Sequence, residues 1–308
     1  IYQIASNGME YLMDTQEFMV RNTDWDRVCL ELLYLKFDRS IYDFSGLNNF
    51  PILKSGSVVY GDDRFENCNY AIKLSNSDYL EVNSLNERAI SFWFKMEKPE
   101  QMIIYDGGPM GEEFKNWNVG IYKPGGLGTM TSFDTTFGLY FDIGSLAIAV
   151  PFDGLKSGWH FVAISRDISR FTNFRIMLDG KFSAGFVFDE LDTINSWTKF
   201  DQQPFSFPSN RFGVPNRHDN YYKSYIGVDA QGEKIWGKGQ SYFDGWLDEF
   251  HIYGKLLNER EMYELYTLKD PSPIEATITS TQYTCSSGDL TVKSTGSAKN
   301  LRYMWNTG

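Results

Sequence analysis

The chain has few cysteines, no strongly basic segment and no long apolar run. Its three cysteines, Cys29, Cys68 and Cys285, are too scattered for a disulfide framework or a zinc site, which leaves at most a bridge between Cys29 and Cys68. No apolar stretch approaches the ~20 residues needed to cross a bilayer, and no signal peptide is visible. The formal charge is −11, and no basic stripe could neutralise phosphates, so nucleic acid is not expected as a partner.

Aromatic and β-branched residues dominate what is present. Aromatics make up 17% of the 308 residues, and 27 glycines punctuate the chain, a composition that favours strands and turns. Thirteen segments between residues 29 and 254 read as strands, separated by turn residues. In "AISFWFKM", Ile90, Phe92 and Phe94 share one face, which is typical of an antiparallel sheet. These features predict an all-β fold, an antiparallel two-sheet jelly-roll sandwich.

One helix and a second unit are predicted near the end of the chain. In "NEREMYELYTL", Asn258 can cap the helix with Glu261 completing a capping box, while Met262, Leu265 and Tyr266 share an apolar face. The two prolines of "KDPSPIEA" then indicate a linker. We expect a lead-in at 1–28, the sandwich at 29–268, a linker at 269–276 and an incomplete Ig-like unit at 277–308, as part of a longer chain.

Six segments in order resemble the laminin-G-like, concanavalin A-like jelly roll. They are "LLYLKFDRSIYDFSGLNNF", "YAIKLSNSDYLEV", "AISFWFKM", "WHFVAISRD" with "NFRIMLDGK", "SYIGV" and "FDGWLDEFHIYGKLLNEREMYELY". The likeness covers roughly residues 29–268. It implies two antiparallel sheets whose rim loops bind carbohydrate or protein. The segment from Cys285 to "YMWNTG" is similar to Ig-like repeats of bacterial surface adhesins.

The resemblance also implies a structural Ca²⁺ ion between the turn "DFSGLNN" and the strand "WLDEF". The ligands would be Asp43, Gly46, Asn48 and Asp248, with Leu47 as the alternative to Asn48 for a carbonyl. Calcium accepts six to eight oxygens, including carbonyls of a glycine-containing turn. The alternative is an ordinary turn in which Asp43 bonds its own backbone. Because neighbouring strand residues face opposite ways, we expect only one of Asp248 and Glu249 to point at an ion.

Catalytic patterns are weak in this sequence. Glu190 and Asp192 in "DELDTIN" have the alternate spacing of a jelly-roll glycosidase, but the third carboxylate is missing and the stretch reads as a loop. The three histidines, His160, His218 and His251, are far apart in sequence and no Gly-x-Ser-x-Gly motif accompanies them. We therefore expect no enzyme, with structural roles for His160 and His251.

Long polar and aromatic loops are the predicted ligand-binding segments, because sugars stack on aromatic rings and bond to neighbouring polar groups. The candidate residues are Trp117, Asn118, Tyr221, Tyr222 and Trp236. The sequence thus predicts a lectin-like module that binds glycan or surface protein, on a cell surface or secreted. The alternative is a structural or attachment component of a phage virion, whose lead-in or Ig-like unit contacts other subunits.

Overall fold

The computed structural model describes most of residues 31–268 and four strands outside them. The gaps are 76, 84, 86, 99, 108–117, 126–134, 143–145, 156–157, 168–171, 190–196, 203, 208–222 and 230–241. The chain divides into two compact units, Arg27–Leu268 and a second formed by Ile1–Asp26 with Lys269–Gly308. Each unit is described by itself.

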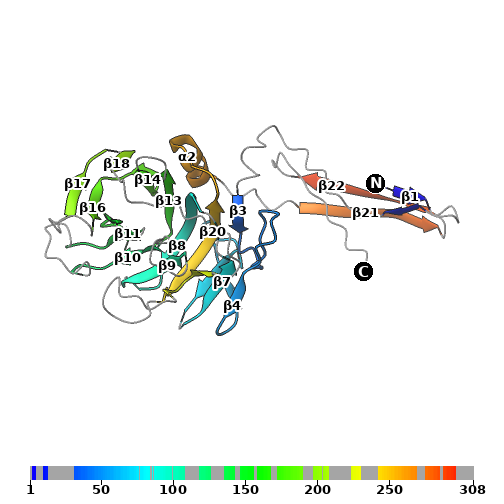
Figure 1. Cartoon of the computed structure of the whole chain (residues 1–308). Coiled ribbons are helices and arrows are strands. Elements are labelled where there is room, and N and C mark those ends of the chain that lie inside the picture. Colours follow the sequence, from blue (N-terminus) through cyan, green and yellow to red (C-terminus); the bar gives the residue numbers. More distant parts are fainter. Residues whose placement is uncertain are drawn as a thin grey trace. The chain divides into compact units, whose positions relative to one another are not determined.

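Two antiparallel sheets make up the larger unit (Figure 1). The described strands of the first sheet lie in the order β17 (Trp197–Phe200), β16 (Gly185–Asp189), β12 (Leu146–Pro151), β11 (Gly138–Asp142), β10 (Asn118–Tyr122), β9 (Met102–Asp106), β19 (Lys223–Ile226), β7 (Tyr79–Asn83) and β4 (Ile52–Lys54). Those of the second lie in the order β15 (Lys181–Phe182), β14 (Thr172–Leu178), β13 (His160–Asp167), β8 (Ala89–Met96), β20 (Gly245–Tyr253), β6 (Ala71–Leu74) and β5 (Val59–Gly61). The short strand β18 (Phe205–Phe207) pairs with β14.

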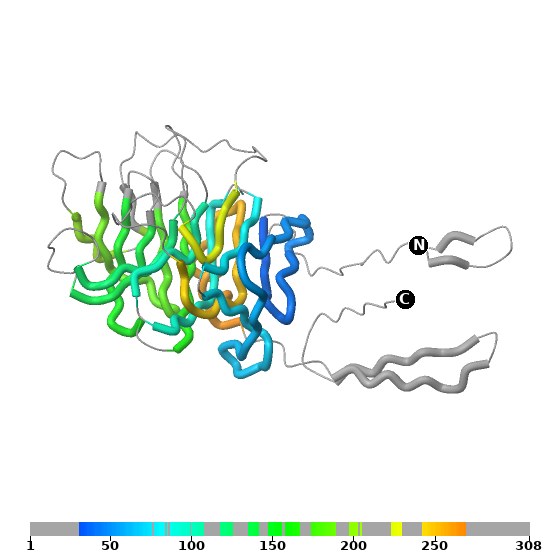
Figure 2. Tube along the Cα trace, turned by 90° about the horizontal axis from the view of Figure 1, so that it is seen from below, coloured from blue at the N-terminus to red at the C-terminus, as the bar shows by residue number. Residues whose placement is uncertain are grey.

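The central strand β20 changes partner halfway along one side. Its first residues, Gly245–Leu247, pair with β6, and its last residues, from Phe250 to Tyr253, pair with β3 (Glu31–Leu35). A β-bulge between Asp248 and His251 separates the two halves. In Figure 2 the first described segment of the unit, in blue, lies beside the yellow-to-orange end of β20.

The core lies between the sheets and follows the alternation of the strands. On β8, Ile90, Phe92 and Phe94 are fully buried in it, and on β20 Phe250 packs against Phe92 with ring centroids 5.3 Å apart. On β8, core residues alternate with residues that face away from the core, because successive side chains of a strand point to opposite faces. The structure therefore confirms the predicted all-β sandwich of two antiparallel sheets.

Helix α2 (Glu259–Thr267) covers part of the outer face of the second sheet. Its N-terminus has the predicted capping box: the side chain of Asn258 accepts from the backbone N–H of Glu261, and the Glu261 side chain accepts from that of Asn258. Met262 is buried, and Tyr266 stacks on Trp93 of β8 at 5.7 Å. This packing fixes α2 over β8 and β13.

The described strands of the smaller unit form two hairpin-like pairs. Strand β1 (Tyr2–Ile4) pairs with β2 (Glu10–Leu12), and β21 (Glu275–Thr284) pairs with β22 (Ser287–Thr295). The Ig-like assignment stays a prediction, since Cys285 and the stretch "YMWNTG" lie outside the described residues. In the larger unit, Cys68 carries a free and exposed thiol, so the alternative of a Cys29–Cys68 bridge is not formed in this structure.

Candidate functional site

A row of polar and aromatic side chains crosses the outer face of the first sheet. Cross-strand pairing joins Glu81 to Tyr225, Tyr225 to Asp106, and Asp106 to Asn118. The same register continues through Asp142 and Ala147 to Phe188 and Trp197. We call Glu81, Tyr225, Asp106, Asn118, Phe188 and Trp197 the outer row.

The outer row faces away from the core because its members alternate with core residues. Tyr105 and Val119, next to Asp106 and Asn118 in sequence, are core side chains. Asp106 and Asn118 are nevertheless buried, while Glu81, Tyr225 and Trp197 are half-buried. The row therefore has a buried polar centre flanked by partly accessible side chains.

Aromatic rings stand at both ends of the outer row. At one end, Tyr225 meets Tyr79 edge to face, with ring centroids 6.0 Å apart. At the other, Phe188 and Trp197 lie 5.4 Å apart at a tilt of 39°. Rings of this kind offer apolar faces, and the carboxylate and amide between them offer hydrogen-bond partners.

The electrostatics of this face are acidic but partly balanced. Lys54 and Lys223 lie 3.3 Å and 3.9 Å from carboxylate oxygens of Glu81. Burial, followed by the nearby Glu81 and Asp106 carboxylates, raises the pKa of Tyr225, so its hydroxyl stays protonated at neutral pH. The row therefore presents neutral donors together with acceptors, which suits an uncharged polar ligand.

Only one of the five predicted ligand-binding residues lies in the described part of the chain. Asn118 is that residue, and it stands at the buried centre of the outer row. The other four candidates, Trp117, Tyr221, Tyr222 and Trp236, lie outside the described residues. Their binding role stays a prediction.

A second cluster surrounds the bulge of β20. Glu249 has a left-handed backbone with φ of 48°, a conformation that a non-glycine residue adopts at an energetic cost. Its carboxylate accepts from the hydroxyl of Tyr34 at 2.6 Å and lies 3.4 Å from Nε2 of His251. The other ring nitrogen of His251 lies 2.6 Å from Glu31.

The two carboxylates at the bulge have partners on the same outer face of the sheet, not on opposite faces. Asp248 pairs with Arg64 at 2.5 Å, and Arg64 lies over the ring of Trp93. Our expectation of opposite orientations for Asp248 and Glu249 was wrong, because the bulge interrupts the alternation of the strand.

A small cavity of about 10 Å³, room for one water molecule, opens beside this cluster. Arg64, His251 and Ser91 line it, together with apolar residues of α2 and β13. The hydroxyl of Ser91 is fully buried and makes no hydrogen bond within the described part of the chain. A bound water is the occupant that this volume and polarity accommodate.

The turn predicted to bind calcium is held by its own hydrogen bonds. The Asp43 carboxylate accepts from the backbone N–H groups of Tyr34 (3.0 Å), Ser45 (2.9 Å) and Asn49 (2.8 Å), and from the Ser45 hydroxyl (2.8 Å). Gly46 and Asn48 supply the left-handed backbone that closes the turn, with φ of 86° and 59°. This is the alternative in which Asp43 bonds its own backbone.

The hydrogen bonds and the ion pair around these residues leave few of their oxygens for a calcium ion. A carboxylate offers about four lone-pair sites, and N–H and O–H groups occupy all four on Asp43. Asp248 faces the cation Arg64, and among the described residues no group of three or more Asp, Glu, His or Cys side chains could hold a metal ion. Calcium needs six to eight oxygen ligands. Its binding at Asp43, Gly46, Asn48 and Asp248 is untested and stays a prediction.

The residues weighed for catalysis are not gathered in the described part of the chain. Glu190, Asp192 and His218 lie outside it. His160 and His251 are on strands of the second sheet, and each bonds a carboxylate: Nδ1 of His160 lies 2.9 Å from Asp179. Both histidines are bound in the way expected of structural residues.

Sequence reasoning missed most of the outer row. Glu81, Tyr225 and Asp106 lie in segments that were read as strands, each at a position that alternates with core residues. Period-two alternation could have indicated that these side chains face outward. It could not have shown that they lie side by side, because the sequence of one strand does not determine its register with a distant strand.

Comparison with known proteins gives similarity of structure alone. No family model matches the chain, and no curated protein is similar to it in sequence. Domain 4 of AbnA, an extracellular arabinanase from Geobacillus stearothermophilus solved with arabinotriose, has a TM-score of 0.49 and 16% identity, over 77% of this chain and 98% of that one.

Two further structures belong to botulinum neurotoxins. One, of type C, comes from a study of cell entry through two ganglioside molecules and has a TM-score of 0.46 and 15% identity. The other is the binding domain of neurotoxin DC with rat synaptotagmin II, with a TM-score of 0.44 and 14% identity. This chain covers 51% of each of them, and each match spans 78% of this chain.

Proposed function

We propose that the sandwich is a non-enzymatic carbohydrate-binding module and that the outer row of the first sheet is its binding face. The observation that carries the proposal is the register that brings Glu81, Tyr225, Asp106 and Asn118 into one line, which continues to the aromatic pair of Phe188 and Trp197. Carbohydrates combine apolar ring faces with many hydroxyl groups, so aromatic rings and carboxylate or amide groups in one row match their chemistry.

Neutral polysaccharides fit this face better than acidic ones. The centre of the row holds Asp106, and Glu81 stands on the other side of Tyr225, so an anionic sugar would meet like charge. A neutral sugar can instead donate its hydroxyl hydrogens to the Asp106 carboxylate and accept from Asn118 and Tyr225. We propose the same extracellular setting as the sequence predicts, because that is where such glycans occur.

The test is a glycan array followed by titration calorimetry on the full chain. The variants Tyr225→Ala, Asp106→Asn and Asn118→Ala should each weaken binding of a neutral glycan by at least about tenfold, which corresponds to about 1.4 kcal/mol. Tyr263→Ala serves as control, since Tyr263 lies on α2, 54% exposed and away from this sheet.

Tyr225→Phe separates stacking from hydrogen bonding at the same position. It should keep most of the affinity if the ring face carries the interaction, and both Tyr225 variants should keep the melting temperature within a few degrees of the wild type. A blank array with neutral glycans, or equal losses in Tyr263→Ala and Tyr225→Ala, would contradict the proposal.

A further inference from the structure

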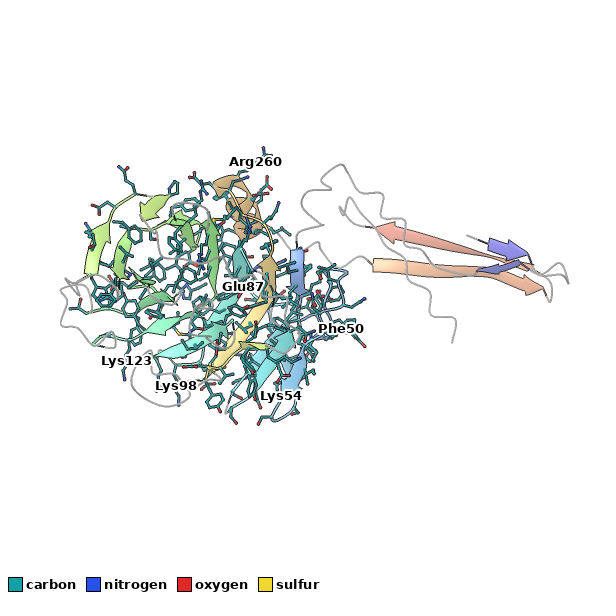
Figure 3. The ribbon with its side chains drawn as sticks, viewed as in Figure 1. Phe50, Lys54, Glu87, Lys98, Lys123 and Arg260 are labelled. Carbon is teal, nitrogen blue, oxygen red and sulfur yellow. The ribbon has the colours of Figure 1, made fainter. Side chains whose placement is uncertain are left out.

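The segment from Tyr42 to Ile52 turns its apolar side chains outward. Tyr42, Phe44, Leu47, Phe50 and Ile52 are between 48% and 64% exposed. Figure 3 shows Phe50 at the outer edge of the larger unit. Large apolar side chains gathered on one short segment are unusual on a protein surface and mark a contact site.

Three polar side chains of the same segment are bonded to the body of the protein, and a fourth, Asn48, is exposed. Asp43 and Ser45 are buried, and the Asn49 side chain donates to the carbonyl of Leu32 at 2.7 Å. The segment therefore has the reverse of the usual arrangement, with polar groups holding it to the body and apolar groups facing solvent. We call Tyr42, Phe44, Leu47 and Phe50 the apolar tip.

The backbone of this segment is largely satisfied from within the protein. The N–H groups of Phe44, Ser45 and Asn49 donate to Tyr34 or Asp43, and that of Leu47 donates to the Ser45 hydroxyl at 3.2 Å. Pro51 has no N–H to satisfy. A backbone with its donors already bonded can leave water at low cost.

A basic side chain stands beside the apolar tip. The ammonium of Lys36 lies 5.7 Å from the ring centroid of Phe44. Asp43 is the only charged residue between Tyr42 and Ile52, and it is buried. Long basic side chains at the margin of an apolar surface can keep their charges in water while their stems lie against it.

We propose that the apolar tip inserts into the interfacial region of a lipid bilayer and that this contact is distinct from glycan binding at the outer row. Three aromatic rings and a leucine on one hydrogen-bonded turn match the chemistry of the headgroup and upper acyl region, where amphipathic rings collect. Membrane contact requires no spanning segment, and no described helix is long and apolar enough to be one.

A lipid surface fits these residues better than a protein partner or a second copy of the chain. A protein interface surrounds its apolar centre with directional hydrogen bonds, about one per 100–200 Å². Here the polar side chains and much of the backbone of the segment are engaged inside the protein. A fluid lipid surface needs no such partners. A second copy of the chain would also bring together two net charges of −11, which repel each other.

The test uses flotation of the full chain with vesicles of phosphatidylcholine, with and without phosphatidylserine. Wild-type protein should float with phosphatidylcholine alone, because the contact is apolar. Phosphatidylserine should not be needed, since a chain of net negative charge gains no attraction from an anionic lipid. The variant Phe44→Ser/Leu47→Ser/Phe50→Ser should reduce vesicle partitioning at least about tenfold, since three apolar anchors are lost. Its glycan binding and melting temperature should stay unchanged, which separates this proposal from the function of the outer row.

A position-specific control is available on α2. In a background without the native cysteines, an environment-sensitive dye at Leu47→Cys should shift to the blue with vesicles, and the same dye at Tyr263→Cys should not. Absence of wild-type flotation, or a shift at both positions, would overturn the proposal. So would vesicle-independent self-association that the triple variant abolishes, because the tip would then bind a second copy.

Discussion

The guanidinium of Arg64 and the carboxylate of Asp248 lie 2.5 Å apart and leave only 7% and 2% of their side chains exposed. Arg64 also donates to the carbonyl of Leu268, just beyond the end of α2. Removing one member of a buried pair leaves an uncompensated charge, so Arg64→Leu should lower the free energy of unfolding by about 3–5 kcal/mol. Urea denaturation measures this loss.

The exposed pair of Arg260 and Glu264 on α2 is the matched control. Its members lie 2.9 Å apart, but the Arg260 side chain is 87% exposed. Arg260→Leu should therefore cost less than about 0.5 kcal/mol. Equal losses in the two variants would show that burial does not set the strength of the Arg64 pair.

Replacing Asp43 should destabilise the protein whether or not a chelator is present. Asp43→Ala removes the acceptor of three backbone N–H groups, which we expect to cost about 1–3 kcal/mol. Thermal melts with and without EDTA test this. A melting temperature that EDTA lowers in the wild type, but not in Asp43→Ala, would instead support the calcium prediction.

Stability should fall in mildly alkaline solution because of His251. Burial alone would lower the pKa of His251, but bonds to Glu249 and Glu31 outweigh it and raise the pKa to about 9. A raised pKa gives stability that is complete below the unfolded value of about 6.5 and lost as pH rises through 9. The loss should be about 3 kcal/mol, and His251→Gln should abolish this pH dependence; an unchanged slope would contradict the assignment.

Glu87 should make the protein less stable as the pH rises from about 4 to 8. Burial raises the pKa of Glu87 to about 7, although the Tyr105 hydroxyl, which donates to it at 3.1 Å, and the nearby Arg166 oppose this shift. The stability from its neutral form is complete below about 4.5 and lost as pH rises through 7. Glu87→Gln should therefore abolish the loss of stability between pH ~4 and pH ~8.

The control for this prediction is Glu100→Gln, at an exposed position. It should not change stability appreciably at either pH. If Glu87→Gln still lost stability over this pH range, ionisation of Glu87 would not be the cause of that loss.

Local alternation predicted the long strands well and the short edge strands poorly. "AISFWFKM" forms β8 over Ala89–Met96, with Ile90, Phe92 and Phe94 in the core. The edge strands β4 and β5 have only three residues each, too few to show alternation, and their pairing is set by neighbouring strands. Long strands in the middle of a sheet can therefore be predicted from the sequence, whereas short strands at its edge cannot.

The candidate site was less accessible to sequence reasoning than the fold. Tyr225 and Asp106 are neighbours in space but 119 residues apart in sequence, so nothing local joins them. At Asp248 and Glu249, the alternation rule failed because the bulge adds a residue with left-handed backbone. Asn118 was predicted from the polar and aromatic residues around it in the sequence, which requires no knowledge of strand pairing. It is the one described candidate that lies in the outer row.

The pairing of β3 with β20 also governs when this domain can fold. Their contacts join the start of the larger unit to its end, and the Tyr34–Glu249 hydrogen bond spans 215 residues. Such distant contacts pay a large loop-closure entropy before they contribute stability. During synthesis, β3 stays without its partner strand until β20 leaves the ribosome, so the sheet of the emerging chain cannot close before nearly the whole domain has been made.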